Sequence, residues 1–153
     1  MRTVIQRVRE AAVTVVEEAG AEREVGRIAE GLVALVGFTH DDGDESLAWM
    51  AKKLADLRVF EALEGGSGFD RSLRDTGGGL LVVSQFTLYG DARKGRRPDF
   101  TAAAPYERAQ DLYHAFCERC EAELPGRVAL GAFGARMSIS LVNDGPVTIL
   151  LER

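Results

Sequence analysis

Three polar side chains stand at the end of the most apolar stretch of the chain. The run GGGLLVV is followed by Ser84, Gln85 and Thr87. Hydroxyl and carboxamide groups can orient a substrate, but none of the three is a strong base. If one strand runs through this stretch, Gln85 and Thr87 share a face, and Ser84 and Phe86 share the other. The pattern indicates either a site at a strand end or polar groups that merely close the strand.

Four cations follow within six residues of the next segment: Arg93, Lys94, Arg96 and Arg97. The whole chain has 19 basic and 24 acidic residues and a net charge of −5, so no overall field attracts nucleic acid. Any binding to a polyanion must come from a local patch, in which arginine can clamp a phosphate with two hydrogen bonds. A solvated loop is the alternative interpretation of these charges.

Other familiar site patterns are missing from the sequence. It has no G-x-S-x-G, H-E-x-x-H or P-loop motif. Cys117 and Cys120 share a helix face with His114, but His40 is the only other histidine and is far away in sequence. A zinc site needs more ligands, so buried thiols are the better interpretation. We expect no metal and no cofactor, and we disfavour a Ser-His-Asp triad.

The remaining pattern predicts strands at both ends and two helices between them. Strands are expected in TVIQRV, AAVTVVEE, GLVALVGF, GGGLLVVSQFTL, RVALGAF, MSISLV and VTILLER, with NDGP as a turn and EALEGGSGFD as a loop. Helical spacing of apolar residues predicts a helix over Asp44–Arg58 and a second one opened by Pro105 and ended by LPG. This order favours sheets with two helices packed on one side.

The 153 residues are predicted to form one domain, 1–153, without a membrane-spanning segment. The opening MRTVIQRVRE has arginines within a strand-like pattern and lacks the features of a signal peptide. We therefore expect a cytoplasmic protein.

Several of these segments together resemble the D-aminoacyl-tRNA deacylases. The resemblance is carried by VSQFTL, KGRRPDF, LYHAF, GAFGARM and SLVNDGPVT, and it covers the whole chain in order. It implies an α/β domain of three layers, β/β/α, with mostly antiparallel sheets and two main helices. It also implies a homodimer that hydrolyses D-aminoacyl-tRNA and mischarged glycyl-tRNA and rejects L-aminoacyl-tRNA.

The same resemblance implies roles for particular residues. Gly145 and Pro146 match a cis pair that reaches into the partner's pocket and holds the substrate's amino group, although a trans bond is the general expectation. Arg7 matches an arginine that supports this pair. Phe133 and Met137 match positions near the terminal adenosine of the tRNA.

Ser84, Gln85, Phe86 and Thr87 match the motif that lines the aminoacyl site. Backbone N–H groups at Phe86 and Thr87 would suit an ester oxyanion. A threonine nucleophile needs an adjacent base, and none is evident in the motif. We therefore favour activation by the 2′-hydroxyl of the terminal ribose, or by a water molecule that it positions, over attack by Thr87.

Two departures and two competing functions accompany this interpretation. Phe69-Asp70 stands where the family commonly has Met-Asn, and Arg96-Arg97 replaces Asn-Arg. A module that binds tRNA ends without hydrolysis would have affinity for aminoacyl-tRNA but would not deacylate it. A hydrolase of small D-amino acid esters would act without the tRNA and would not need the 2′-hydroxyl.

Overall fold

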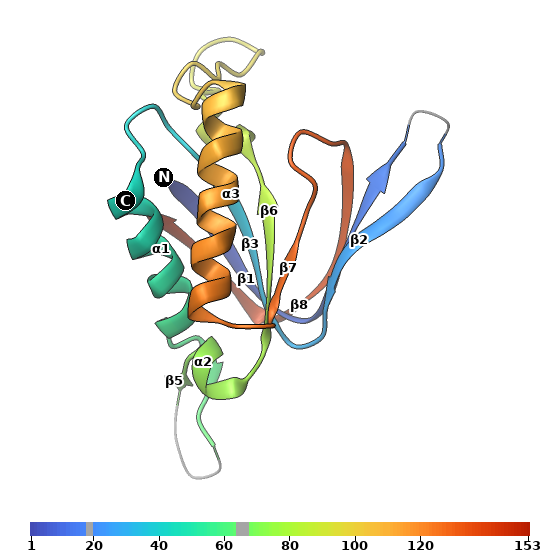
Figure 1. The fold of residues 1–153 in the computed structure, drawn as a ribbon, viewed down its shortest axis with the longest axis vertical. Coiled ribbons are helices and arrows are strands. Elements are labelled where there is room, and N and C mark those ends of the chain that lie inside the picture. Colours follow the sequence, from blue (N-terminus) through green and yellow to red (C-terminus); the bar gives the residue numbers. More distant parts are fainter. Residues whose placement is uncertain (18–19, 64–67) are drawn as a thin grey trace.

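The structure is a computed structural model that describes residues 1–17, 20–63 and 68–153. Figure 1 shows a curved sheet with two long helices on one side. The strands are β1 (Arg2–Val16), β2 (Glu22–Ile28), β3 (Gly31–Gly37), β4 (Phe60–Glu61), β5 (Phe69–Arg71), β6 (Gly79–Ser84), β7 (Val128–Leu130) and β8 (Met137–Glu152). The helices are α1 (Asp44–Asp56), α2 (Leu73–Thr76) and α3 (Tyr106–Glu123), and a short 3₁₀ turn, η1, spans Phe86–Tyr89.

The long strand β1 is the centre of the main sheet. One edge of β1 pairs antiparallel with β8. Along its other edge, the first half of β1 pairs with β3 and the second half with β2, and both pairings are antiparallel. Beyond β3 the sheet continues through β6 and β7, and both of these pairings are parallel. The sheet is thus mixed, with its longest pairings antiparallel, and the small β4–β5 hairpin is separate.

The two helices cover one face of the sheet and bury the first core. The predicted helices are confirmed: α1 begins at Asp44 and ends two residues before the expected end, and α3 begins directly after Pro105. Met50 from α1 and Phe116 from α3 belong to the same buried cluster as Leu80 of β6. This cluster lies between the helix layer and the sheet.

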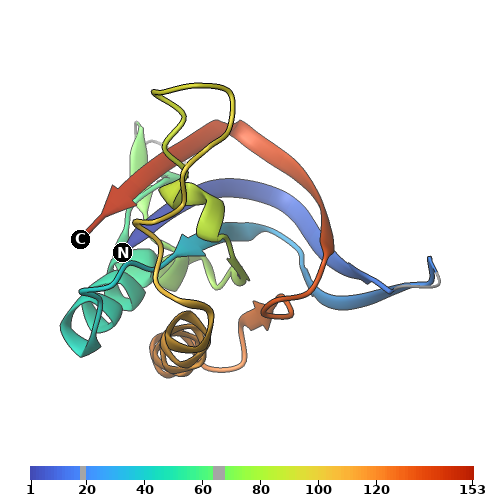
Figure 2. The same ribbon diagram turned by 90° about the horizontal axis from the view of Figure 1, so that it is seen from above.

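A second core fills the space inside the curl of the sheet. The register of β1 against β8 shifts on both sides of Val8, and such bulges increase bend and twist. Figure 2 shows β1 and β8 sweeping around as a curved ribbon. Val13 of β1 and Ile139 of β8 thereby pack in one cluster with Leu81 of β6. The expected three-layer β/β/α arrangement is therefore confirmed.

Three local predictions need correction. The β6 strand ends at Ser84 and η1 follows, so the strand-face alternation predicted for residues 84–87 is wrong. NDGP is not a turn between two strands, because β8 runs through it as one bulged strand. The loop predicted at 61–70 includes ends of the β4–β5 hairpin, and its residues 64–67 lie outside the described residues.

None of the described helices is long and apolar enough to cross a membrane.

Candidate active site

The turn η1 carries the polar residues that follow β6. The Gln85 N–H donates to the Val36 carbonyl oxygen at 2.7 Å, which extends the ladder by one bond before the chain turns. Tyr89 is buried and anchors the far end of the turn. Gly37 provides the necessary room, because a Cβ at this position would lie 2.9 Å from the Gln85 carbonyl oxygen. The end of β3 thus fixes where the turn sits.

Two backbone N–H groups at the start of η1 have no acceptor. The first N–H groups of a helical turn lack partners within it, and no described residue accepts a hydrogen bond from the N–H of Phe86 or Thr87. Both residues are exposed, so both groups can meet a ligand oxygen. The Gln85 carboxamide donates to the Thr87 hydroxyl. A carboxamide cannot remove a proton, so this contact orients Thr87 without activating it.

A mainly apolar cavity of about 480 Å³ opens beside this turn. Two T-shaped aromatic pairs form part of its wall: Phe86 with Phe100 and Tyr106 with Phe133, each with ring centroids 5.2 Å apart. Its lining comprises Val36, Gly37, Phe38, Ser84, Gln85, Phe86, Phe100, Ala103, Ala104, Pro105, Tyr106, Ala109, Phe133 and Gly134. Such walls suit a planar ring.

The chemistry of this lining is limited. Among the described residues of the wall there is no carboxylate, histidine, thiol or amine, and Tyr106 is the one titratable side chain. The wall therefore supplies neither a general base of ordinary strength nor a metal-ligand set. It can hold a ring, and the adjacent N–H pair can stabilise an anionic oxygen.

The predicted site residues lie in four places: the cavity with its turn, the second core, a bulge of β8, and the loop of residues 93–97. Ser84, Gln85, Phe86 and Phe133 line the cavity, and Thr87 lies on the same turn. Met137 does not line the cavity but packs against the second core.

Gly145 and Pro146 lie in a bulge of β8 away from this cavity. Asn143 pairs with Val8 and Thr148 with Gln6, so residues 144–147 bulge out opposite Arg7. The Gly145–Pro146 bond is cis, and both residues are exposed. Neither lines the cavity of its own chain.

Arg7 is buried beneath this bulge. It is 4% exposed, and its Nη1 donates to the Val59 carbonyl oxygen at 2.7 Å. Its Nη2 lies 3.0 Å from Asp144 Oδ2. Phe69, one of the two family departures, lies with its ring centroid 5.7 Å from the Arg7 guanidinium, so this departure borders the bulge rather than the cavity.

The cation-rich loop borders a second hollow of about 690 Å³. Asp91 and Asp99 close the loop by pairing with each other. Arg93 is paired with Asp91 at 2.6 Å, and this hydrogen bond lowers the pKa of Asp91 to about 2. Lys94 and Arg97 line the hollow, whereas Arg96 does not. The hollow and the apolar cavity share the segment 99–104 as a wall.

The cysteines and histidines are not gathered into a site. Cys117 and Cys120 are buried free thiols, and burial raises the pKa of Cys117 to about 12. Within residues 1–17, 20–63 and 68–153, no group of three or more histidine, cysteine or acidic residues is arranged to hold a metal. The thiols therefore behave as core residues.

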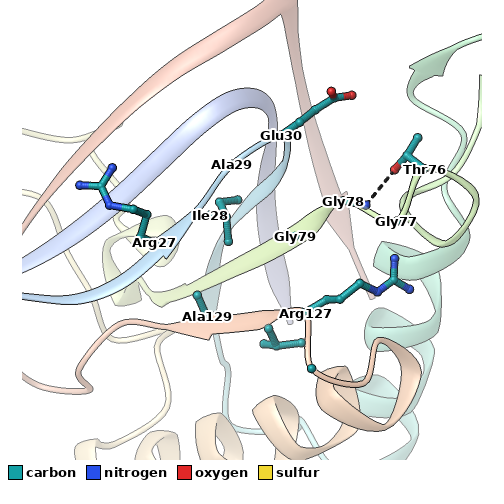
Figure 3. A pocket seen from close by; sticks show the side chains of 12 residues that line it. Arg27, Ile28, Ala29, Glu30, Thr76, Gly77, Gly78, Gly79, Arg127 and Ala129 are labelled. Atoms are coloured by element: carbon teal, nitrogen blue, oxygen red, sulfur yellow. Dashed lines mark hydrogen bonds between the residues drawn. The ribbon is translucent and has the colours of Figure 1, made fainter.

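A further cavity of about 500 Å³ lies at the opposite end of β6. Figure 3 shows residues that line it, among them Arg27 of β2, Arg127 directly before β7, and Gly77, Gly78 and Gly79. Arg27 donates a hydrogen bond to the Glu24 carboxylate, and Arg127 donates one to the Leu73 carbonyl oxygen. None of the residues predicted for a site lines this cavity.

Sequence reasoning missed several residues of the wall. Phe100 and Tyr106 come from two different segments, and neither segment is adjacent to residues 84–87 in sequence. Their positions in the sequence were only a weak indication of a site: Phe100 comes at the end of the cationic segment, and Tyr106 directly follows Pro105. Gly37 gave no signal, because its role is visible only once Gln85 lies against it.

Gly37→Ala should disturb this turn. The added Cβ would lie 2.9 Å from a backbone oxygen, so Gln85 must move, and such overpacking costs about 1–3 kcal/mol. We expect a lower melting temperature together with slower turnover of the substrate. Gly43→Ala is the control, because nothing lies within 4 Å of its added Cβ. Turnover equal to the unsubstituted protein in Gly37→Ala would show that the position of the turn is unimportant.

Comparison with known proteins gives a consistent result. The family model described as D-Tyr-tRNA(Tyr) deacylase matches residues 4–152. A protein of Chlorobaculum parvum named D-aminoacyl-tRNA deacylase is 53% identical over 99% of this chain and 97% of its own length. Proteins of the same name from Brevibacillus brevis and Thermus aquaticus are each 51% identical over 99% of this chain, and over 99% and 95% of their own lengths.

Solved structures agree with the fold. The structure titled c-Myc DNA Unwinding Element Binding Protein is 40% identical with a TM-score of 0.90, over 100% of this chain and 99% of its own. A second structure, titled as a probable eukaryotic D-amino acid tRNA deacylase, has a TM-score of 0.83 at 21% identity and covers 98% of this chain and 97% of its own. At that identity the second likeness supports the fold alone.

Proposed function

The chain belongs to the D-Tyr-tRNA(Tyr) deacylase family, and from this premise we propose how its turn and cavity carry out deacylation. The protein is a D-aminoacyl-tRNA deacylase, a hydrolase of the ester bond between a D-amino acid and tRNA. The terminal adenine enters the aromatic-walled cavity, and the ester carbonyl meets the N–H groups of Phe86 and Thr87. The observation that carries this assignment is the pair of unpartnered N–H groups beside a cavity for a planar ring.

These two N–H groups supply the electrostatic part of the reaction. Attack on the ester carbonyl places a negative charge on its oxygen, and one donor of this kind contributes about 10²- to 10³-fold in rate. The attacking group is water, because the hydrogen-bond partner of the Thr87 hydroxyl among the described residues is the Gln85 carboxamide, which cannot take up its proton. With no base in the described cavity wall, the 2′-hydroxyl of the terminal ribose positions or activates this water.

Chirality is filtered by a second copy of the chain. In this proposal the protein is a homodimer, and Gly145 and Pro146 of one copy enter the cavity of the other. Their carbonyl oxygens hold the substrate's amino group, so an L side chain collides with them and a D side chain points away. Glycine has no side chain to collide, so glycyl-tRNA is also hydrolysed.

Exposure around the bulge supports this dimer. Gly145 and Pro146 are exposed, and β8 also presents Val142 and Leu150, which are 46% and 59% exposed. Contiguous apolar surface often marks an interaction site, so these side chains are candidates for the contact between the two copies. Sedimentation equilibrium tests the assembly: a monomer at every concentration would contradict it.

The cation-rich loop meets the phosphates next to the terminal nucleotide. Its hollow shares a wall with the cavity, so an RNA end that fills one passes the other. Lys94 and Arg97 line the hollow, and Arg96 adds charge nearby. Arg93 contributes less, because Asp91 already neutralises it.

Salt dependence of tRNA binding measures these contacts. Affinity for RNA falls as salt rises, and each neutralised phosphate of a single strand makes the slope of log affinity against log salt steeper by about 0.7. We expect Lys94→Ala and Arg97→Ala each to lower the slope by about that amount, and Arg93→Ala to lower it less. Arg27→Ala, at the far end of β6, serves as the control. Unchanged slopes in all variants would mean that the cations of the loop face solvent and contact no phosphate of the tRNA.

Deacylation of D-tyrosyl-tRNA and L-tyrosyl-tRNA, measured side by side, tests the function. Rapid loss of the D ester with the L ester spared is the expected result. Loss of neither would leave a module that grips tRNA ends, and loss of both would remove the chirality filter. Turnover of free D-tyrosine esters at the same rate would favour a hydrolase of small esters. As a translation enzyme, the protein is proposed to act in the cytoplasm.

A further inference from the structure

The bulge that presents Gly145 and Pro146 is held mainly by side chains. Its first anchor is Asn143, whose Nδ2 donates to the carbonyl oxygens of Arg7 at 2.9 Å and Val147 at 3.0 Å. Val147 is buried and forms the second anchor. Between these anchors the β1–β8 ladder has no paired residue.

Asp144 joins the bulge to two arginines of β1. Its Oδ2 lies 3.0 Å from Arg7 Nη2, and its Oδ1 accepts a hydrogen bond of 3.0 Å from Arg9 Nε. The side chain of Arg7 is 5% exposed and that of Arg9 is 75% exposed. One carboxylate therefore links a buried guanidinium to one at the surface, directly before Gly145 in the chain.

Arg7 depends on this carboxylate for its counter-charge. The other acid near it, Glu61, lies 3.8 Å from the same Nη2 and is 78% exposed. The Nε of Arg7 is buried and has no partner among the described residues. A buried cation without a close anion is strongly unfavourable, so loss of the Asp144 charge should move the Arg7 side chain, the bulge, or both.

The ionisation of Asp144 is consistent with this arrangement. The hydrogen bond from Arg9, together with the charges of Arg7 and Arg9, holds the pKa of Asp144 below its ordinary value. The group is therefore a carboxylate at neutral pH. Both of its oxygens accept from guanidinium groups, and such charge-assisted bonds are stronger than neutral ones.

We propose that Asp144 is a positioning residue for chirality discrimination, which it serves by bridging Arg7 and Arg9 and so fixing the Gly145–Pro146 bulge. This inference rests on the proposed function, in which Gly145 and Pro146 hold the substrate's amino group. Asparagine cannot replace Asp144, because its NH₂ group would face one of the two guanidinium donors.

The test compares Asp144→Asn with the unsubstituted protein on D-tyrosyl-tRNA and L-tyrosyl-tRNA. We expect the ratio of D to L deacylation rates to fall about tenfold, the scale on which hydrogen bonds between charged groups contribute. Two changes produce this fall: KM for the D ester rises, and the L ester is lost faster. The maximal rate on the D ester changes less, because the N–H groups of the turn η1 are untouched.

Two variants show whether position or mere charge matters. Glu61→Gln removes the other acid near Arg7 and should change the ratio by less than about twofold, since exposed ion pairs contribute little. Asp144→Glu keeps the carboxylate and should restore part of the discrimination. A purely structural role would lower the melting temperature without changing the ratio.

Arg9→Gln gives an independent reading, because it removes only the exposed contact of Asp144. It should lower the ratio less than Asp144→Asn, and the double variant should be no worse than Asp144→Asn alone. An unchanged ratio in a folded Asp144→Asn protein overturns the proposal. If that variant does not fold, an unchanged ratio in Arg9→Gln overturns it. Failure of the unsubstituted protein to distinguish the two esters overturns the proposed function itself, and with it this role.

Discussion

D-Tyrosyl-tRNA ending in a 2′-deoxyadenosine should be hydrolysed about 10²- to 10⁴-fold more slowly than the ribose form, which is the range that a general acid–base group contributes. The physical reason is the composition of the cavity. Its described wall has no carboxylate, histidine, thiol or amine to activate water. Single-turnover rates with the amino acid attached at the 3′-oxygen measure the effect.

Thr87→Ala separates this mechanism from attack by the protein. The variant keeps the backbone N–H that stabilises the oxyanion and loses only a hydroxyl that a carboxamide orients. We expect its rate on the ribose substrate to stay within about tenfold of the unsubstituted protein. The opposite pattern, with Thr87→Ala inactive and the deoxy substrate turned over normally, would make Thr87 the nucleophile.

Gly145→Ala should lower deacylation of D-tyrosyl-tRNA by about 100-fold, because displacements of about 1 Å in positioning groups have effects of this size. Gly145 has φ of +109°, a region that residues with a Cβ rarely adopt. The added Cβ would also lie 2.9 Å from both Arg7 Nη2 and Val147 Cγ2. Backbone and neighbours must therefore both shift at the tip of the bulge.

Gly77→Ala is the matched control for the backbone contribution. Gly77 has φ of +72° and nothing within 4 Å of an added Cβ, and it lies at the far end of β6. It should lower the unfolding free energy by about 1 kcal/mol and leave the rate unchanged. Thermal unfolding and deacylation of both variants are measured together. Equal rates in the two variants would show that Gly145 has no more than a conformational role.

Much of the fold follows from patterns that are local in sequence. The spacing of Leu47, Met50 and Leu54 predicted α1, and Pro105 marked the start of α3. Continuous apolar runs predicted β3 and β6, which are buried between the layers. Each of these signals reports burial of one face of one element, and burial has the period of the element itself.

Resemblance to a family also identified the residues of the turn and of the bulge, through VSQFTL and SLVNDGPVT. They did not predict the geometry of either. Residues 85–87 were expected to continue a strand, but the chain turns there because Gly37 of β3 admits the Gln85 carbonyl oxygen. NDGP was expected to be a turn, but β1 continues beside it and keeps β8 as one strand. In both places a neighbouring strand decided the conformation.

The sequence by itself determined the apolar elements, the polar residues after β6 and the cluster of cations. Only the tertiary structure decided which of these meet. It placed Phe100, Tyr106 and Phe133 around one cavity, sent Met137 to the second core, and set Asp144 against Arg7. The reason is physical: side-chain periodicity acts within about two turns or a few strand residues, whereas these contacts join segments tens of residues apart through the curl of the sheet.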